Sequence, residues 1–156
     1  MSEVPFVHLH CHTDYSLLDG ACEIGQLMDI VSAHKMPAVA MTDHGNLFGG
    51  VQFYDSARAK GIHPVIGCEV YVSRQGHKTR GDGDRYNHLV LLCENQEGYR
   101  NLIKLVSAGF LEGFYYKPRI DHELLAKHSR GLIALDRKST RLNSSHIRKS
   151  RMPSSA

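Results

Sequence analysis

The sequence has few features of a membrane or exported protein. Its 156 residues contain no apolar run near the roughly 20 residues that a membrane helix needs, and no basic stretch followed by an apolar one at the N-terminus. These absences predict a cytoplasmic protein with no membrane partner. The length allows one hydrophobic core, but it falls short of the roughly 250 residues of a complete eight-unit β/α barrel.

Cysteine is also scarce. The four cysteines, at positions 11, 22, 68 and 93, include no C-x-x-C pair of the kind used in zinc knuckles and redox motifs. In the compartment inferred above, disulfides are rare. We therefore expect reduced thiols that serve as small hydrophobic side chains.

Positive charge is unevenly distributed. The net charge is +3, yet residues 136–156 alone hold six Lys or Arg and one Asp, so the preceding 135 residues are close to neutral at −2. The overall pI is therefore no evidence for a nucleic-acid surface. The same 21 residues are rich in serine and poor in apolar residues, a composition typical of disorder. We predict a folded part over 1–135 and a disordered tail over 136–156.

Hydrophobic periodicity in the folded part predicts alternating strands and helices. For example, Ile24, Leu27, Met28 and Val31 recur at helical spacing, and Asp121 can cap a short helix. The alternation favours an α/β fold with a mainly parallel sheet, and short buried strands favour a barrel. The expected strands cover residues 6–9, 38–41, 63–72, 89–93 and 132–135, and the expected helices cover 23–34, a segment from the 45–50 turn to about 60, 96–108 and 121–127.

Metal-capable side chains lie near the ends of four of these strands. Residues two apart on an extended strand share a face, so His8, His10 and His12 are expected to project together. His44, Glu69 and His88 accompany the later strands. Because the carboxyl ends of barrel strands meet at one rim, the sequence predicts a metal centre there.

Several longer strings extend over most of the chain, from about Phe6 to Leu135. They are HLHCHTDYSLLDG, MPAVAMTDHGNLFG, GIHPVIGCEVYV, NHLVLL, EGYRNLIKLVS and EGFYYKPRID. Together they resemble the PHP (polymerase and histidinol phosphatase) domain found in the alpha subunit of bacterial DNA polymerase III. The resemblance implies an incomplete PHP-type, distorted TIM-like β/α barrel.

The resemblance also implies a ligand set for divalent metal ions. His8 and Asp43 would lie beside the ligands and orient them. Asp43 has an alternative role as a turn carboxylate that caps the next segment. Histidine and carboxylate ligands favour Zn, Mn or Fe, with up to about three ions in an intact domain. The implied ligands are His10, His12, Asp19, His44, Glu69 and His88.

The sequence departs from the family after Leu135. There the family continues into further ligand-bearing strands, whereas this chain continues into DRKSTRLNSSHIRKSRMPSSA. We therefore interpret residues 136–156 as a non-native tail on a truncated domain, and we expect the chain by itself to be inactive.

The resemblance implies metal-dependent phosphoesterase or 3′–5′ exonuclease chemistry within a replicative DNA polymerase whose DNA-synthesising region is absent here. The implied partners are DNA, through the full-length protein, and other replicative subunits including a proofreading exonuclease. Two alternatives remain open: a non-catalytic scaffold for the polymerase body or a proofreading subunit, and a free-standing PHP phosphatase.

The remaining histidines and an aromatic segment give weaker predictions. Residues 114–116 are expected to form an aromatic loop. With Lys117 and Arg119, this loop is a candidate contact either for nucleic acid or for a neighbouring domain. Six histidines are expected to face solvent: His34, His63, His77, His122, His128 and His146.

Overall fold

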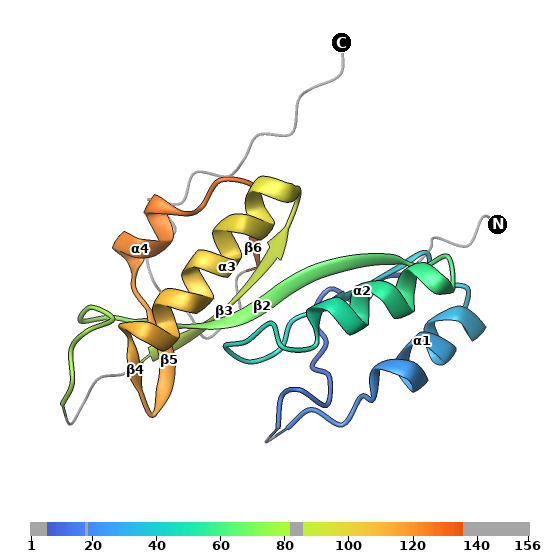
Figure 1. Ribbon diagram of the computed structural model, residues 1–156, viewed down its shortest axis with the longest axis horizontal. Coiled ribbons are helices and arrows are strands. Elements are labelled where there is room, and N and C mark those ends of the chain that lie inside the picture. Colours follow the sequence, from blue (N-terminus) through green and yellow to red (C-terminus); the bar gives the residue numbers. More distant parts are fainter. Residues whose placement is uncertain (1–5, 18, 82–85, 136–156) are drawn as a thin grey trace, which may run out of the picture.

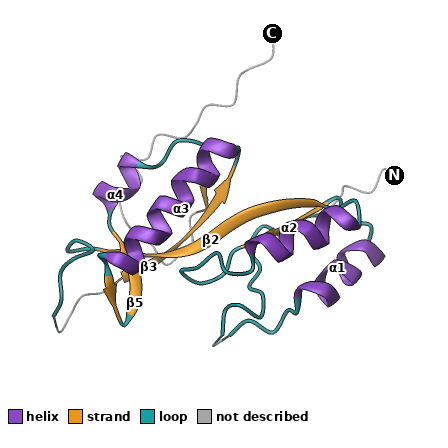
Figure 2. Ribbon diagram, in the orientation of Figure 1, coloured by secondary structure: helices purple, strands orange, loops and turns teal. Residues whose placement is uncertain are grey.

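The computed structural model describes residues 6–17, 19–81 and 86–135. These residues form four helices and six strands (Figures 1 and 2). The α/β class is as predicted. The elements in chain order are α1 (Ile24–Ala33), β1 (Ala38–Met41), α2 (Gly50–Ala59), β2 (His63–Ser73), β3 (Tyr86–Cys93), α3 (Gln96–Leu111), β4 (Phe114–Tyr115), β5 (Lys117–Ile120), α4 (His122–Lys127) and β6 (Leu132–Leu135).

The described strands form one open sheet of mixed direction, in the order β4-β5-β2-β3-β6, with β1 also paired to β2. β1 and β5 run parallel to β2, whereas β3 is antiparallel to both β2 and β6. The prediction of a mainly parallel sheet is therefore wrong. Parallel neighbours need a crossover, usually a helix, and the described part of the β2–β3 connection contains none.

The long strand β2 organises the sheet. β3 pairs along one of its edges, while β1 and β5 share the other edge. β1 pairs as far as Ile66, and β5 pairs only with Tyr71 and Val72. The backbone of β2 between these two partners is therefore available to another segment, and the candidate site forms there.

Two predicted elements differ from the structure. The segment expected as a first strand makes only an isolated bridge between His8 and Val39, although it runs beside β1 through a bond from the Ala40 N–H to the His8 carbonyl. The expected aromatic loop is instead the β4–β5 hairpin, whose turn residue Tyr116 has a φ of 58°.

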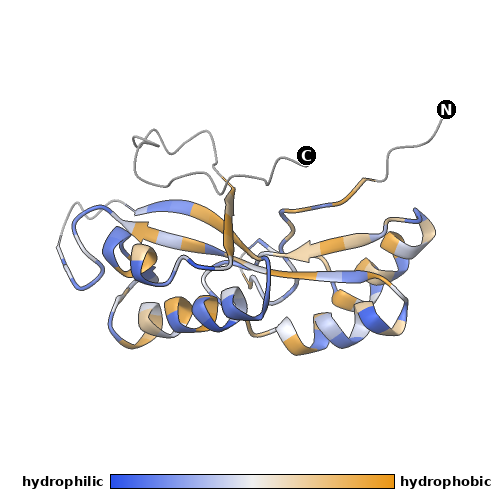
Figure 3. Ribbon diagram, turned by 90° about the horizontal axis from the view of Figure 1, so that it is seen from above, coloured by the Kyte–Doolittle hydropathy of each residue, from blue (hydrophilic) through white to orange (hydrophobic). Residues whose placement is uncertain are grey.

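The core has two main parts, and α1, α2 and α3 all lie to one side of the strands (Figure 3). Ile24, Met28 and Val31 of α1 pack with Phe53 of α2 and with β1. Leu102 and Leu105 of α3 pack with β2, β3 and β5. A smaller cluster that includes Ala40, Val90 and Leu92 lies apart from both.

His77 does not face solvent as expected. Its side chain is only 14% exposed, and it lies between Asp121, 2.5 Å from Nδ1, and Glu112, 3.8 Å from Nε2. Buried Arg119 donates to the carbonyls of His77 and Thr79. The segment after β2 is thereby tied to β5 and α4. Of the other five histidines, His34, His63 and His122 are exposed, His128 is half-buried, and His146 lies outside the described residues.

We expect Asp121 to make the free energy of unfolding depend on pH in the acidic range. Burial disfavours its charge, but hydrogen bonds from His77 and the Leu124 N–H outweigh burial and lower the pKa of Asp121 to about 2. The stabilisation is thus present above pH 4 and is lost as pH falls from about 4 to 2. Asp121→Asn should cost up to about 2 kcal/mol above pH 4 and only a small part of that near pH 2, measured by urea unfolding.

Asp55→Asn, at an exposed position of α2, is the matched control and should leave the pH profile unchanged. A stability difference between the parent chain and Asp121→Asn that is the same at pH 5 and pH 2 would contradict the role assigned to Asp121.

Candidate metal centre

The candidate site forms around Glu69, in the middle of β2. Its side chain is fully buried, an unusual position for a carboxylate. The loop after β1 fills the edge of β2 here: the Gly45 N–H donates to the Glu69 carbonyl, and the Glu69 N–H donates to the Asp43 carbonyl, at 2.9 and 3.0 Å. These two bonds place His44 beside Glu69.

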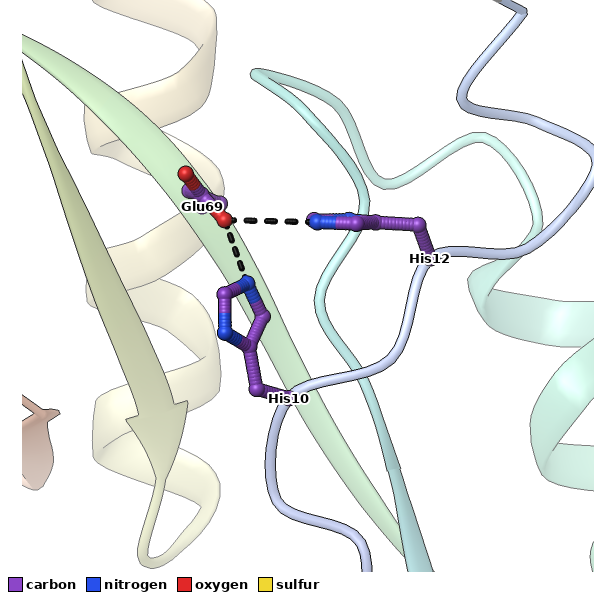
Figure 4. Close-up of side chains that lie close together, drawn as sticks. All are labelled: His10, His12 and Glu69. Atoms are coloured by element: carbon purple, nitrogen blue, oxygen red, sulfur yellow. Dashed lines mark hydrogen bonds and ion pairs between the residues drawn. The ribbon is translucent and has the colours of Figure 1, made fainter. Parts of the chain in front are cut away.

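Four imidazoles surround the Glu69 carboxylate. His10 Nε2 contacts Oε2, and His12 Nε2 lies 3.3 Å from the same oxygen (Figure 4). On the other oxygen, Oε1, His88 Nδ1 lies at 2.5 Å and His44 Nδ1 at 3.9 Å. The two carboxylate oxygens therefore face different pairs of histidines.

A second carboxylate, that of Asp19, extends the site toward solvent. Its Oδ2 lies 2.8 Å from His44 Nε2, and its side chain is 51% exposed. The His12 and His44 rings stack with centroids 4.2 Å apart. All six predicted ligands thus gather in three overlapping groups, each with its ligand atoms within 4.8 Å of one another: His10, His12 and Glu69; His12, Asp19 and His44; and His44, Glu69 and His88.

Strand register explains how His88 joins the group. β3 begins at Tyr86 rather than at residue 89, so His88 lies inside the strand and not before it. It pairs with Tyr71, two residues from Glu69 on β2, and therefore shares the face of the sheet that carries Glu69. Antiparallel pairing, which the sequence analysis did not anticipate, brings this histidine to the site.

Asp43 joins the loop after β1 to the turn after His12. Among the described residues, its carboxylate forms no hydrogen bond with an imidazole. Its buried carboxylate accepts from the Thr13 N–H and hydroxyl, at 2.6 and 2.7 Å, and from the Ser16 hydroxyl, at 3.1 Å. The Ser16 oxygen in turn accepts from the His44 N–H. These contacts run to a segment that precedes Asp43 in the chain, rather than to the next segment, and they bring the segment carrying Asp19 against His44.

His8 lies outside the three groups; its ring meets Phe6 edge to face. The segment is not a regular strand, so the alternation rule used for its three histidines does not apply.

The sequence analysis missed Thr13, Ser16 and Tyr71. Serine and threonine in a turn give no signal of burial, whereas the position of Tyr71, two residues after Glu69 on one strand, is such a signal.

The electrostatics of the cluster keep Glu69 ionised. Burial disfavours its charge, but hydrogen bonds with His88 and His10 and the charge of His44 outweigh it and lower the pKa of Glu69. Burial, followed by the nearby charge of His44, lowers the pKa of His12. Burial raises the pKa of the Cys11 thiol to about 12, and the cluster itself consists of imidazoles and carboxylates.

The donor set fits a divalent cation. The Nδ1 atoms of His12 and His44 are buried and have no hydrogen-bond partner among the described residues. Buried polar atoms are normally paired, and His44 Nδ1 lies 3.9 Å from Glu69 Oε1, so these unpaired imidazole nitrogens are suited to ligation.

A pocket of about 470 Å³ opens beside the cluster. Asp19, His44 and His88 form part of its wall, and Lys117 and Pro118 of β5 form another part. Gly45, at a φ of 64°, allows the loop to pass close to Tyr71 and Pro118, since an added Cβ would lie 2.7 Å from the proline ring.

Comparison with known proteins identifies the family. The model of the PHP domain matches residues 8–151. The chain belongs to the PHP domain family. Residues 136–151 of this match fall in the segment predicted to be a non-native tail; they lie outside the described residues, and that boundary stays a prediction.

The PHP chain is similar to DNA polymerase III alpha subunits. It is 50% identical to the subunit of Chlamydia trachomatis over 133 residues, 83% of this chain, and 51% identical to that of Thermus aquaticus over 140 residues, 86% of this chain. It spans only 11–12% of the length of these relatives.

Two solved structures are similar to part of this chain. An amidohydrolase from Chromobacterium violaceum is 24% identical, with a TM-score of 0.48. The alignment covers 65% of this chain and 32% of the amidohydrolase chain. A proposed metal-dependent phosphoesterase from Bifidobacterium adolescentis is 17% identical, with 68% and 33% covered and a TM-score of 0.49. Overlaps of this size carry no functional argument. Within the described residues of the PHP chain, no helix has the length and apolar character to cross a membrane.

We expect Asp43→Ala to destabilise the protein strongly. The substitution leaves the Thr13 N–H and two buried hydroxyls without their acceptor, at about 1–3 kcal/mol for each unsatisfied group. Urea unfolding should show a loss of about 3 kcal/mol or more, whereas Asp55→Ala at an exposed position should change stability by under about 0.5 kcal/mol. Equal effects of the two substitutions would contradict the role of Asp43.

Proposed function

We propose that His10, His12, Asp19, His44, Glu69 and His88 bind divalent metal ions, and that the chain is the PHP module of a longer DNA polymerase III alpha subunit. The chemistry that we propose for the module is hydrolysis of phosphoesters, with the 3′-terminal nucleotide of DNA as substrate. The observation that carries the proposal is the convergence of six metal-capable side chains in three overlapping groups. Identity of about 50% to alpha subunits supports the polymerase assignment.

The shared residues indicate adjoining cation sites. His12, His44 and Glu69 each belong to two of the three groups. A divalent cation bound by such a set supplies Lewis-acid activation of water and neutralises the charge that develops on a phosphodiester. Zn, Mn and Fe all accept imidazole together with carboxylate.

The exposure of the candidate ligands differs, which gives the site a buried base and an exposed rim. Glu69 lies fully buried at the base, while Asp19 and His10 are 51% and 37% exposed at the rim. A phosphodiester can therefore approach from the rim side. In the proposed reaction a water oxygen forms a bond to phosphorus, the bond from phosphorus to O3′ breaks, and the departing O3′ takes up a proton to balance the proton that the attacking water loses. The phosphate stays on the released nucleotide.

A second function, as a scaffold for the polymerase body, is favoured by an exposed apolar groove. A cavity of about 360 Å³ beside α3 is lined almost entirely by apolar side chains, among them Phe48, Ile103, Phe110 and Leu111. Exposed apolar surface of this kind is typical of contact sites. Under this alternative, bound metal serves only stability. The relatives described above give no support to a free-standing phosphatase.

Partners and location follow from the polymerase assignment and are part of the proposal. We expect the full-length protein to act on DNA in the cytoplasm together with other replicative subunits, including a proofreading exonuclease. We also expect the 156-residue chain alone to be inactive in hydrolysis, because it spans only 11–12% of the length of the alpha subunits that it resembles.

Metal binding is the first test. Glu69→Gln and His44→Ala should each lower Mn²⁺ or Zn²⁺ affinity at least tenfold in the full-length subunit, because each residue belongs to two ligand groups. Isothermal titration and metal content measure this effect. Glu94→Gln and His34→Ala, at exposed positions, are the matched controls and should bind metal as the parent does.

Hydrolysis separates the two functions. Release of a 3′-terminal nucleotide by the full-length subunit should fall at least a hundredfold in Glu69→Gln and stay unchanged in both controls. If Glu69→Gln loses metal but releases nucleotide at the parent rate, the scaffold function holds. Unchanged metal affinity in both site variants would overturn the metal centre itself.

A further inference from the structure

The pocket beside the candidate metal centre has a second wall that the proposed metal chemistry does not require. This wall is strongly aromatic and comes from segments far apart in the chain: the turn after His12, the loop before α2, strands β2 and β3, and α3. Its rings are those of Tyr15, Phe48, Tyr71, Tyr86 and Phe110.

Two of these rings are open to solvent. Phe48 is 68% exposed and Phe110 is 37% exposed, and their centroids lie 5.9 Å apart at an angle of 40°. Phenylalanine has no polar atom to hydrate, so ring surface left open beside a polar site favours a ligand with its own apolar or aromatic face. By contrast, Tyr71 is buried and its ring lies against His44 and His88, joining the aromatic wall to the cluster.

A single lysine completes the pocket. Lys117 Nζ lies 5.6 Å from the centroid of the Tyr71 ring, and within the described ranges no carboxylate forms an ion pair with it. An ammonium group held over an aromatic ring and left without an anion is suited to a phosphate. The pocket therefore combines a cation, aromatic faces and the candidate metal ligands.

We propose that this pocket binds a nucleotide, with its phosphate between Lys117 and the metal centre and its base against Phe48 and Phe110. The inference rests on the proposed function and deepens it by naming what selects the substrate. The volume of about 470 Å³ lies within the range of roughly 300–1,000 Å³ that is usual for small-ligand sites. Stacking on an aromatic ring tolerates any base, so the pocket selects a nucleotide without selecting a sequence.

The proposal distinguishes a nucleotide from a sugar phosphate, which has no base to place on Phe48. In the metal-saturated full-length subunit, deoxyadenosine monophosphate should bind about tenfold or more tightly than 2-deoxyribose 5-phosphate, measured by isothermal titration. Phe48→Ala should abolish this preference and leave the affinity for the sugar phosphate unchanged. Phe6→Ala removes a ring of similar exposure, 62%, outside the pocket and should preserve the preference.

Lys117→Met tests the phosphate contact, because it keeps most of the side-chain length and removes the charge. Affinity for both ligands should fall about tenfold, with the nucleotide preference retained. Lys127→Met, at an exposed position on α4, is the matched control and should change neither affinity. For a single-stranded oligonucleotide, Phe48→Ala should raise KM with little change in kcat.

The outcomes separate the two proposals. Equal affinity for the nucleotide and the sugar phosphate, no binding of either, or a preference that survives Phe48→Ala would overturn the nucleotide pocket even where metal binds and hydrolysis proceeds. Conversely, nucleotide binding that depends on Phe48 in a protein that binds no Mn²⁺ or Zn²⁺ would overturn the metal centre and leave the pocket in place.

Discussion

A carboxylate buried in the middle of a strand is the constraint on which this structure depends. Glu69 has no exposed surface, and an isolated ionised carboxylate in the interior costs several kcal/mol. Its carboxylate is surrounded by imidazoles from three other segments, which carry His10 and His12, His44, and His88. Those segments must pack closely around β2, so the same contacts that accommodate Glu69 assemble the candidate metal centre.

The pairing of β2 makes this packing possible. Because β1 and β5 occupy opposite ends of one edge of β2, the backbone near Glu69 is free to bond the loop after β1, which delivers His44. Asp43 in that loop then anchors Thr13 and Ser16, and their segment carries His12 and Asp19. One strand edge and one buried aspartate thus fix the positions of ligands that lie far apart in the sequence.

The sequence predicted what depends on local pattern. Helical spacing identified α1, the capping role of Asp121 was confirmed by its bond from the Leu124 N–H, and β6 covers the predicted residues. The parallel direction expected for β3 was wrong, because the direction of a strand pair depends on the segment that joins the two strands and not on the pattern within either strand. His77 was misassigned because its partners, Glu112 and Asp121, are distant in the chain. The strand-end pattern indicated His10, His12, His44, Glu69 and His88 as metal-capable residues, and the family resemblance added Asp19. Their arrangement in shared groups follows from the fold.

The two oxygens of Glu69 link two of the proposed metal-binding groups to each other. Oε2 faces His10 and His12, whereas Oε1 faces His88 and His44, so a single carboxylate adjoins two different ligand groups. Under the proposed function, a cation held by one group would withdraw negative charge from the other, because both draw on the same carboxylate. Asp19, bonded to His44 and half exposed, contributes further negative charge at the rim. Occupancy of the two groups should therefore be interdependent, since both include Glu69 at the base of the site.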